Sequence, residues 1–201
     1  MDQKGFPNPF HHDEHHHHAA PPNYAQSTQM PASGFRIALN TSQAISKHDL
    51  ERAGHAPFQD LGGEAIYIGS AIFTDANGNQ KSVHPGKIGP HLYPHPCSVP
   101  YGGGERSHQG RYDLLLFDPE HMEWVPTSHG HVPQGRSPVE GGYEENVRDK
   151  LYHARGRVNN VTMPGKTGPH LGAAHFSFGG GEHAVHEHYD ILCWKVPHYK
   201  H

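Results

Sequence analysis

The sequence has few large hydrophobic residues, only two cysteines and no long apolar run. Hydrophobic residues make up 33% of its 201 residues, below the ~45–50% usual in globular domains, a range that also counts glycine. No apolar stretch approaches the roughly 18 residues needed to span a bilayer, and the N-terminal segment lacks the apolar centre of a signal peptide. We therefore expect no membrane insertion, and a cytoplasmic location or export without a signal peptide.

The charge balance and the cysteine count exclude further classes of protein. Sixteen Lys and Arg against 20 Asp and Glu give a net charge of −4, and no basic run follows a helix or stripe, so nucleic acid is not an expected partner. Cys97 and Cys193 do not match between the repeats described below, which favours reduced thiols over a disulfide. No nucleophile elbow, metalloprotease helix or duplicated Ser/His/Asp order is present, so we expect no enzyme.

Histidine, in contrast, is abundant, with 23 copies. Residues 1–34 hold few large aliphatics but many His, Pro, Ser, Gln and Asn, which predicts a disordered tail, because such a segment cannot bury enough surface to offset chain entropy. Its HHDEHHHH run is either a solvated low-complexity segment or an adventitious site for divalent transition metals, and no cofactor is required. The candidate metal ligands are His11, His12, His15, His16, His17 and His18.

The most informative feature of the chain is an internal duplication. Residues 85–92 (PGKIGPHL) and 100–116 (PYGGGERSHQGRYDLLL) recur as 164–171 (PGKTGPHL) and 177–193 (SFGGGEHAVHEHYDILC). The copies lie 79 residues apart at their lysines (166 − 87) and 77 apart at their glutamates (182 − 105). Residues that both copies keep are needed twice, either by the fold or by a site.

The strand pattern predicts an all-β fold. From Leu61 onward, short segments rich in β-branched or aromatic residues are bounded by Gly, Pro, Asn or Asp. Upstream, residues 35–39 alternate as a strand does, and Ser46, Asp49 and Gly54 mark the ends of a short helix. The later predicted strands are 65–73, 112–117, 121–125, 149–158, 173–178 and 189–196. The predicted divisions are a disordered tail (1–34), a connecting strand and helix (35–56), repeat 1 (57–123) and repeat 2 (124–201).

Most residues that the copies share have a structural explanation. The triple glycines 102–104 and 179–181 let the backbone enter regions closed to other residues, or let strands approach closely. The dipeptides Pro85-Gly86 and Pro164-Gly165 are typical of turns that would aim the next lysine outward. The paired tyrosines Tyr112 and Tyr189 are expected in the core, and Asp113 and Asp190 are expected to hydrogen-bond a neighbouring turn.

The charged residues kept in both copies are the site candidates. Lys87 with Lys166, and Glu105 with Glu182, form either a structural salt bridge or the polar floor of a pocket. An ammonium beside a carboxylate offers fixed donors and acceptors, which suits adjacent sugar hydroxyls. Two further candidates, His91 and His170, either line the same pocket or cap a turn. The run His186-Glu187-His188 suits a metal edge, but the first copy has Gln109-Gly110-Arg111 there, so a duplicated zinc site is not supported.

The order of these motifs resembles the DM9 repeat. In the second copy the order is Trp124, GHVP (130–133), PVEGG (138–142), LYHAR (151–155), PGK (164–166), GGGEH (179–183) and YDIL (189–192), and the first copy carries similar motifs from Leu61 onward. The first copy lacks the Trp lead-in, which residues 35–58 would replace, and it carries an inserted hairpin loop at 74–80. The resemblance covers about residues 57–196 and implies pseudo-symmetric all-β repeats that exchange strands.

The resemblance also implies a mannose-recognising lectin whose pocket combines a lysine with an acidic residue. Lys87 and Lys166 carry over through the PGK motif. The family's Asp-Gly-Glu is replaced here, and Glu64 and Asp149, each three residues before its tyrosine (67 − 64 and 152 − 149), are candidate substitutes, with Asp60 another. We expect binding of mannose-containing glycans and a homodimer. The alternatives are a histidine-rich metal-binding protein with scaffold repeats, and an interaction or toxin-type module.

Overall fold

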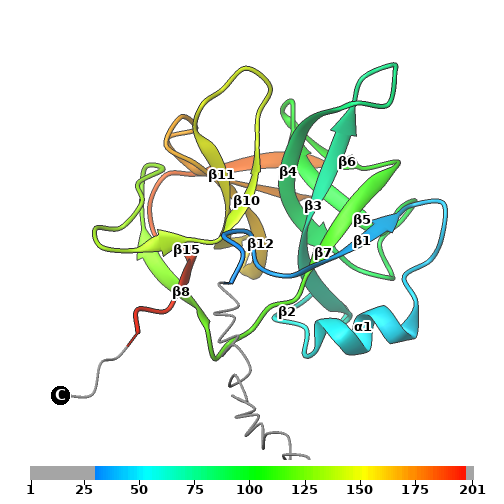
Figure 1. The fold of residues 1–201 in the computed structure, drawn as a ribbon, viewed down its shortest axis with the longest axis horizontal. Coiled ribbons are helices and arrows are strands. Elements are labelled where there is room, and N and C mark those ends of the chain that lie inside the picture. The colour runs from blue at the N-terminus through cyan, green and yellow to red at the C-terminus, as the bar shows by residue number, and fades with distance from the viewer. Residues whose placement is uncertain (1–29, 198–201) are drawn as a thin grey trace, which may run out of the picture.

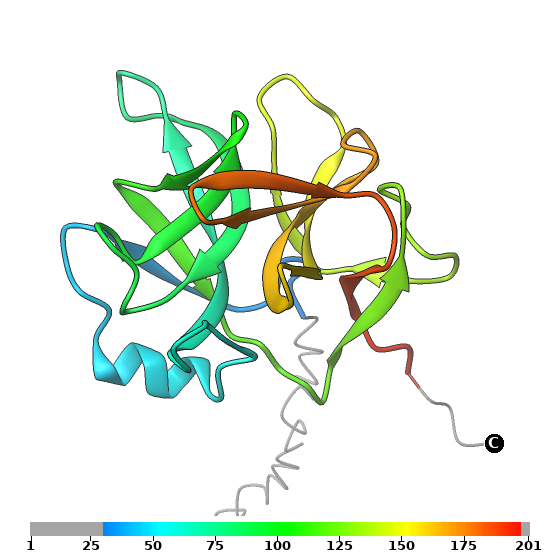
Figure 2. The same cartoon turned by 180° about the vertical axis from the view of Figure 1, so that it is seen from behind.

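The structure, a computed structural model, describes residues 30–197, which form fifteen β-strands and one short helix (Figures 1 and 2). The predicted all-β fold class is confirmed. No helix in this part of the chain is long and apolar enough to cross a membrane. The six-histidine cluster and the predicted tail lie outside the described residues, apart from residues 30–34.

In chain order the elements are β1 (Arg36–Asn40), α1 (Lys47–Ala53), β2 (Phe58–Gln59), β3 (Ala65–Thr74), β4 (Gln80–Ile88), β5 (Cys97–Tyr101), β6 (Gly104–Ser107), β7 (Arg111–Leu115), β8 (Met122–Thr127), β9 (Ser137–Pro138), β10 (Glu140–Tyr143), β11 (Lys150–Val158), β12 (Val161–Thr167), β13 (Ala174–Phe178), β14 (Gly181–Val185) and β15 (Tyr189–Trp194).

The strand order reveals the pseudo-symmetry of the two repeats. Neighbouring strands follow the order β1-β7-β3-β4-β5-β6-β14-β13-β12-β11-β15-β8. Strands at the same position counted from the two ends of this order are counterparts in the two repeats. For example, β4 corresponds to β12 and β6 to β14. In Figure 1 the first repeat lies on the right and the second on the left. Strand β1 pairs with β7 as β8 pairs with β15, so β1 replaces the missing lead-in strand.

The two repeats form one body. Their strands meet at Gly104 opposite Gly181 and at Tyr143 opposite Val83. In residues 30–197 these two single-residue pairings, rather than a long exchanged strand, join the sheets of the repeats. A shared hydrophobic cluster also lies between them, formed by Phe58, Ile66, Ile68, Leu115, Met122, Val139 and Leu192. Each repeat has its own core as well, in which the predicted core tyrosines Tyr112 and Tyr189 are 1% and 2% exposed.

Local sequence signals place the elements before the repeats correctly. The expected strand at 35–39 is β1, and the expected helix is α1. The hydroxyl oxygen of Ser46 caps this helix by accepting a hydrogen bond from the backbone N–H of Asp49 at 3.0 Å. Gly54 follows with a φ of 76°, a region that favours glycine. The predicted insertion is the loop between β3 and β4, where Asp75 accepts hydrogen bonds from the backbone of Asn77 and Asn79.

Two glycine pairs form the tight turns of the repeats. Gly102 and Gly103, between β5 and β6, have φ values of 62° and 81°, and Gly179 and Gly180, between β13 and β14, have values of 59° and 85°. Two successive residues with positive φ are typical of the hairpin turn whose twist matches its strands. The glycines therefore allow a backbone conformation that other residues rarely adopt, as the sequence indicated.

The Pro-Gly dipeptides do not form turns, so that prediction is wrong. Both lie inside strands, Pro85-Gly86 in β4 and Pro164-Gly165 in β12. A Cβ added to Gly86 would lie 2.3 Å from the carbonyl oxygen of Ser98, and one added to Gly165 would lie 2.2 Å from that of His175. Close packing against the neighbouring strand thus overrides the local preference of Pro-Gly for a turn. The following lysines lie in strand interiors instead of projecting from turns.

The paired aspartates bind arginines, and not a neighbouring turn as expected. Arg36 Nη1 donates to Asp113 Oδ1 at 2.8 Å. In the second repeat, Arg155 donates from Nε and Nη2 to Asp190 Oδ2 at 2.8 and 2.6 Å. The prediction failed because the arginine partners come from other strands. Only the aspartate is common to both copies, since the two arginines stand on strands that do not correspond.

This difference arises because the two copies carry different residues at two equivalent strand positions. The registers place Arg36 where β8 has Trp124, and place Ser70 where β11 has Arg155. In the second repeat the Arg155 guanidinium lies 5.2 Å from the centroid of the Trp124 ring. In the first repeat the small Ser70 leaves space for Arg36, whose Nη1 donates to Ser70 Oγ at 3.2 Å. The equivalent carboxylates of Asp113 and Asp190 are therefore neutralised by arginines from different strands.

Arg36 also connects the repeats. Its Nη2 donates to the carbonyl oxygen of Glu140 at 2.9 Å and contacts His153 Nε2 at 2.8 Å. A guanidinium can only donate, so this imidazole nitrogen accepts. Burial lowers the pKa of His153 well below its usual value, and the charge of Arg36 acts in the same direction. A neutral, fully buried histidine of the second repeat thus depends on an arginine that precedes the first.

We predict that Arg36→Met costs about 3–5 kcal/mol of unfolding free energy, because it leaves the Asp113 carboxylate buried without its charged partner. Arg155→Met is the matched control. Its ion pair is more exposed, at 38% and 22% against 14% and 15% for the Arg36 pair, so the loss should be nearer 1 kcal/mol. Denaturant unfolding of both variants measures the difference, and equal losses would contradict the prediction.

Candidate functional site

The two duplicated lysines lie in equivalent, buried places. Lys87 is on β4 and Lys166 on β12, with side chains that are 9% and 4% exposed. An ammonium at such depth is costly unless it is paired and hydrogen-bonded. What surrounds each Nζ atom therefore determines what each cluster can bind.

The first lysine forms a complete ion pair. Lys87 Nζ lies 2.7 Å from Glu105 Oε1 and donates to the carbonyl oxygen of Ser177 at 2.9 Å. The Glu105 carboxylate also accepts from Ser98 Oγ at 3.1 Å and from the backbone N–H of Gly180 at 2.9 Å. Ser177 and Gly180 belong to the second repeat. This group, which we call the Lys87 cluster, therefore exists only when both repeats are assembled.

Hydrogen bonding controls the charge of Glu105. Burial alone raises the pKa of this carboxyl group, but the hydrogen bonds from Lys87, Gly180 and Ser98, together with the charge of Lys87, outweigh it and leave the pKa below its usual value. The carboxylate is thus ionised at neutral pH. Its oxygens are acceptors held in fixed positions at the edge of a cavity of about 240 Å³ that Glu105 and Gly180 line.

The second lysine lacks such a partner. Lys166 Nζ lies 3.3 Å from His84 Nδ1 and 4.0 Å from Glu144 Oε1, and the half-exposed ring of Tyr101 has its centroid 5.7 Å away. Burial lowers the pKa of Lys166, and the charges of Glu182 and Glu144 only partly offset this effect. We call this group the Lys166 cluster. Its ammonium has one close acceptor among the described residues, whereas Lys87 has two.

One substitution between the copies explains the asymmetry. Ser98 on β5 pairs with Lys87, as His175 on β13 pairs with Lys166. In the first copy, Ser98 leaves Glu105 free to reach Lys87. In the second copy, His175 Nδ1 lies 3.0 Å from Glu182 Oε1. Glu182 Oε2 also accepts from the backbone N–H of Gly103 at 2.6 Å. The second glutamate is thus held by the first repeat's turn and by an imidazole.

A carboxylate and a histidine accompany each lysine. His91 Nε2 lies 2.9 Å from Asp60 Oδ2, and His170 Nε2 lies 2.9 Å from Glu144 Oε2. The two acids are equivalent, since Asp60 directly follows β2 and Glu144 directly follows β10. Sequence reasoning included Asp60 but missed Glu144. The sequence did contain a signal for this equivalence. Asp60 stands 7 residues before Tyr67 (67 − 60), and Glu144 stands 8 residues before Tyr152 (152 − 144).

The other two acidic candidates lie outside these clusters. Glu64 and Asp149 are exposed, and within residues 30–197 neither forms an ion pair with Lys87 or Lys166. The Glu64 carboxylate folds back over Gly62, where an added Cβ would lie 2.5 Å from its oxygens. Of the acidic candidates from the sequence, the structure thus places Asp60, Glu105 and Glu182 beside the lysines or their histidines.

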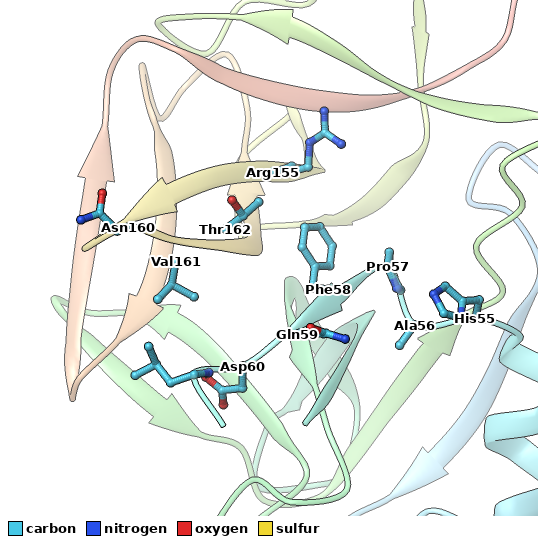
Figure 3. A pocket seen from close by; sticks show the side chains of 11 residues that line it. His55, Ala56, Pro57, Phe58, Gln59, Asp60, Arg155, Asn160, Val161 and Thr162 are labelled. Atoms are coloured by element: carbon cyan, nitrogen blue, oxygen red, sulfur yellow. The ribbon is translucent and has the colours of Figure 1, made fainter. Parts of the chain in front are cut away.

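A polar cleft adjoins the first cluster. It has a volume of about 540 Å³ and includes Asp60 in its lining. Figure 3 shows its two walls, with Phe58, Gln59 and Asp60 on one side and Arg155, Asn160 and Thr162 on the other. The first wall belongs to the segment before β3, and the second to the β11–β12 hairpin. The cleft therefore lies between the repeats and presents amide, hydroxyl and guanidinium groups.

One small group of possible metal ligands is also explained by local structure. Asp118, Glu120 and His121 place three ligand atoms within 4.8 Å of one another. The Asp118 carboxylate already accepts from the backbone N–H of Glu120 at 2.9 Å and lies 2.6 Å from His121 Nδ1. These contacts stabilise the turn before β8. The predicted metal ligands of the tail lie outside the described residues.

Comparison with known proteins agrees with the duplicated architecture. The sequence profile of the DM9 repeat matches residues 60–185 and 148–200. The chain belongs to the DM9 repeat family. No curated protein matches the sequence. Among solved structures, the nematode sperm cell motility protein MFP2B is similar to this DM9 protein, with a TM-score of 0.52 and 14% identity over 81% of this chain and 44% of that one. The chain thus spans less than half the length of MFP2B, and the likeness shows the fold.

We predict that the two lysines respond differently to replacement by methionine. Lys87→Met leaves Glu105 without its cation and should cost about 2–3 kcal/mol of unfolding free energy. Lys166→Met removes a buried charge that has no close carboxylate, so its effect should lie within about 1 kcal/mol of zero, or be stabilising. Chemical denaturation measures both. An equal loss in the two variants would show that Lys166 is as well paired as Lys87.

Proposed function

We propose that this DM9 protein is a lectin that recognises mannose-type glycans through the Lys87 and Lys166 clusters. The observation that carries the proposal is the repetition of one chemical group. Each repeat places a buried lysine, a glycine-turn glutamate and a carboxylate–histidine pair at equivalent positions, and Lys87 pairs directly with its glutamate whereas Lys166 does not. Family membership supports the proposal, since the motifs of the chain resemble those of mannose-recognising DM9 lectins.

The chemistry of the clusters suits vicinal hydroxyls. A sugar hydroxyl both donates and accepts, so a pair of adjacent hydroxyls is bound well by an ammonium beside a carboxylate. Asp60 with His91, and Glu144 with His170, add an acceptor and an imidazole in the neighbourhood of the lysines, with Glu144 Oε1 4.0 Å from Lys166 Nζ. The half-exposed ring of Tyr101 near Lys166 supplies an apolar surface for a sugar C–H face.

The two clusters should differ in affinity. Two of the three N–H groups of Lys87 already serve Glu105 and the Ser177 carbonyl. Lys166 has one acceptor within 3.5 Å among the described residues, the His84 imidazole. More of its hydrogen-bonding capacity is available to a ligand. We therefore assign the stronger site to the Lys166 cluster.

The arrangement favours multivalent glycans. Two weak sites on one chain gain avidity on a surface that carries many copies of the same sugar, and a homodimer would double their number. The cleft between the repeats, which shares Asp60 with the Lys87 cluster (Figure 3), offers room for further sugar residues of a branched chain.

We predict that calorimetry of the full-length protein detects a mannose disaccharide but not the matching galactose disaccharide. Lys166→Met should weaken mannoside binding by about tenfold to a hundredfold, because hydrogen bonds to charged groups contribute about 1.5–3 kcal/mol. Its stability is expected to be nearly unchanged, so a loss of binding reports on the site. Glu64→Gln, which alters an exposed acid outside both clusters, is the control and should bind normally. Absence of mannoside binding to the wild type would refute the proposal.

A further inference from the structure

Away from both lysine clusters, four potential metal ligands from distant parts of the chain lie together. His129 and His131 belong to the loop that follows β8, and His186 and Glu187 lie in the turn between β14 and β15. The sequence separates the two segments by more than 50 residues. The fold places them on one exposed surface of the second repeat, which we call the His129 surface.

Backbone contacts fix the two segments against each other. The backbone N–H of His129 donates to the carbonyl oxygen of His186 at 2.7 Å. The next N–H, of Gly130, donates to the hydroxyl of the buried Tyr189 at 2.7 Å. Gly130 is itself buried, and a Cβ there would lie 2.4 Å from the carbonyl oxygen of Gly168. These contacts fix the backbone of the loop beside the turn, so the side chains of the two segments start from adjacent positions.

Two of the side chains already have the spacing of metal ligands. His129 Nε2 lies 3.2 Å from Glu187 Oε1. Two atoms bound to one tetrahedral Zn²⁺ at about 2.0–2.1 Å lie roughly 3.3 Å apart. The ring of His129 has its centroid 6.1 Å from that of His131 and 6.4 Å from that of His186. His131 and His186 are both exposed, and a third ligand atom requires one of these rings to turn toward the ion.

We propose that the His129 surface binds a divalent transition metal, with Zn²⁺ as the best match to its ligands. Imidazole nitrogens and one carboxylate oxygen are common zinc ligands, and the exposed position leaves a place for water. The site belongs to the second repeat only, because the first has Gln109-Gly110-Arg111 where the second has His186-Glu187-His188. It is separate from the histidines of the tail and does not depend on sugar binding.

The test uses the full chain with its six tail histidines replaced by glutamine, so that the tail does not compete for metal. Zn²⁺ is titrated against a chromophoric chelator at neutral pH. We expect about one tightly bound Zn²⁺ per chain. The combination His129→Asn and His186→Ala removes two ligands, and asparagine tolerates the positive φ of 50° at position 129. It should weaken binding at least as much as the roughly 10–100-fold that loss of an outer-shell partner costs.

His121→Ala is the matched control, because His121 belongs to the other compact group of potential ligands. It should leave zinc affinity unchanged. Thermal unfolding provides a second measurement, since an ion that binds only the folded state raises Tm. This rise should occur in the control and be absent in the double variant. The proposal is overturned if the background protein binds no zinc, if the double variant retains full affinity, or if His121→Ala abolishes binding.

Discussion

Each repeat completes the glycine turn of the other with a glutamate. Glu105 accepts from the backbone of Gly180, and Glu182 accepts from that of Gly103, so the two contacts are related by the pseudo-symmetry of the molecule. A turn with two positive φ values leaves its N–H groups directed outward, and a carboxylate satisfies them with charge-assisted hydrogen bonds. Glu105 also pairs with the buried Lys87, and the charge of Glu182 partly offsets the effect of burial on the pKa of Lys166. The two glutamates that join the repeats therefore also belong to the candidate sites, and neither cluster forms without both copies.

Features that depend on neighbours in the sequence were predictable. The helix with its Ser46 cap, the all-β class and the special conformation of the glycine turns each follow from residues within a few positions of one another. The Pro-Gly dipeptides were misinterpreted, because the need for Gly86 and Gly165 comes from a carbonyl oxygen on the next strand. Nothing in the local sequence separates a glycine that permits a turn from one that permits close packing.

The site was predictable where the copies agree and not where they differ. The lysines and turn glutamates appear from the duplication alone. Glu144 was missed because a one-residue change in loop length hides its equivalence to Asp60. The asymmetry between the lysines was equally hidden. It depends on a serine in one copy and a histidine in the other, and the charge state of Lys166 depends on how deeply the assembled repeats bury it.

The position of Arg36 has a consequence for whether either repeat could stand alone. In two fully independent copies, each copy would carry every side chain that its own buried polar groups need. The first copy has Ser70 where the second has Arg155 and takes its guanidinium from β1, while His153 of the second copy contacts that same guanidinium. A second repeat cut from the chain without β1 would therefore keep the fully buried His153 but lose the guanidinium that its Nε2 contacts.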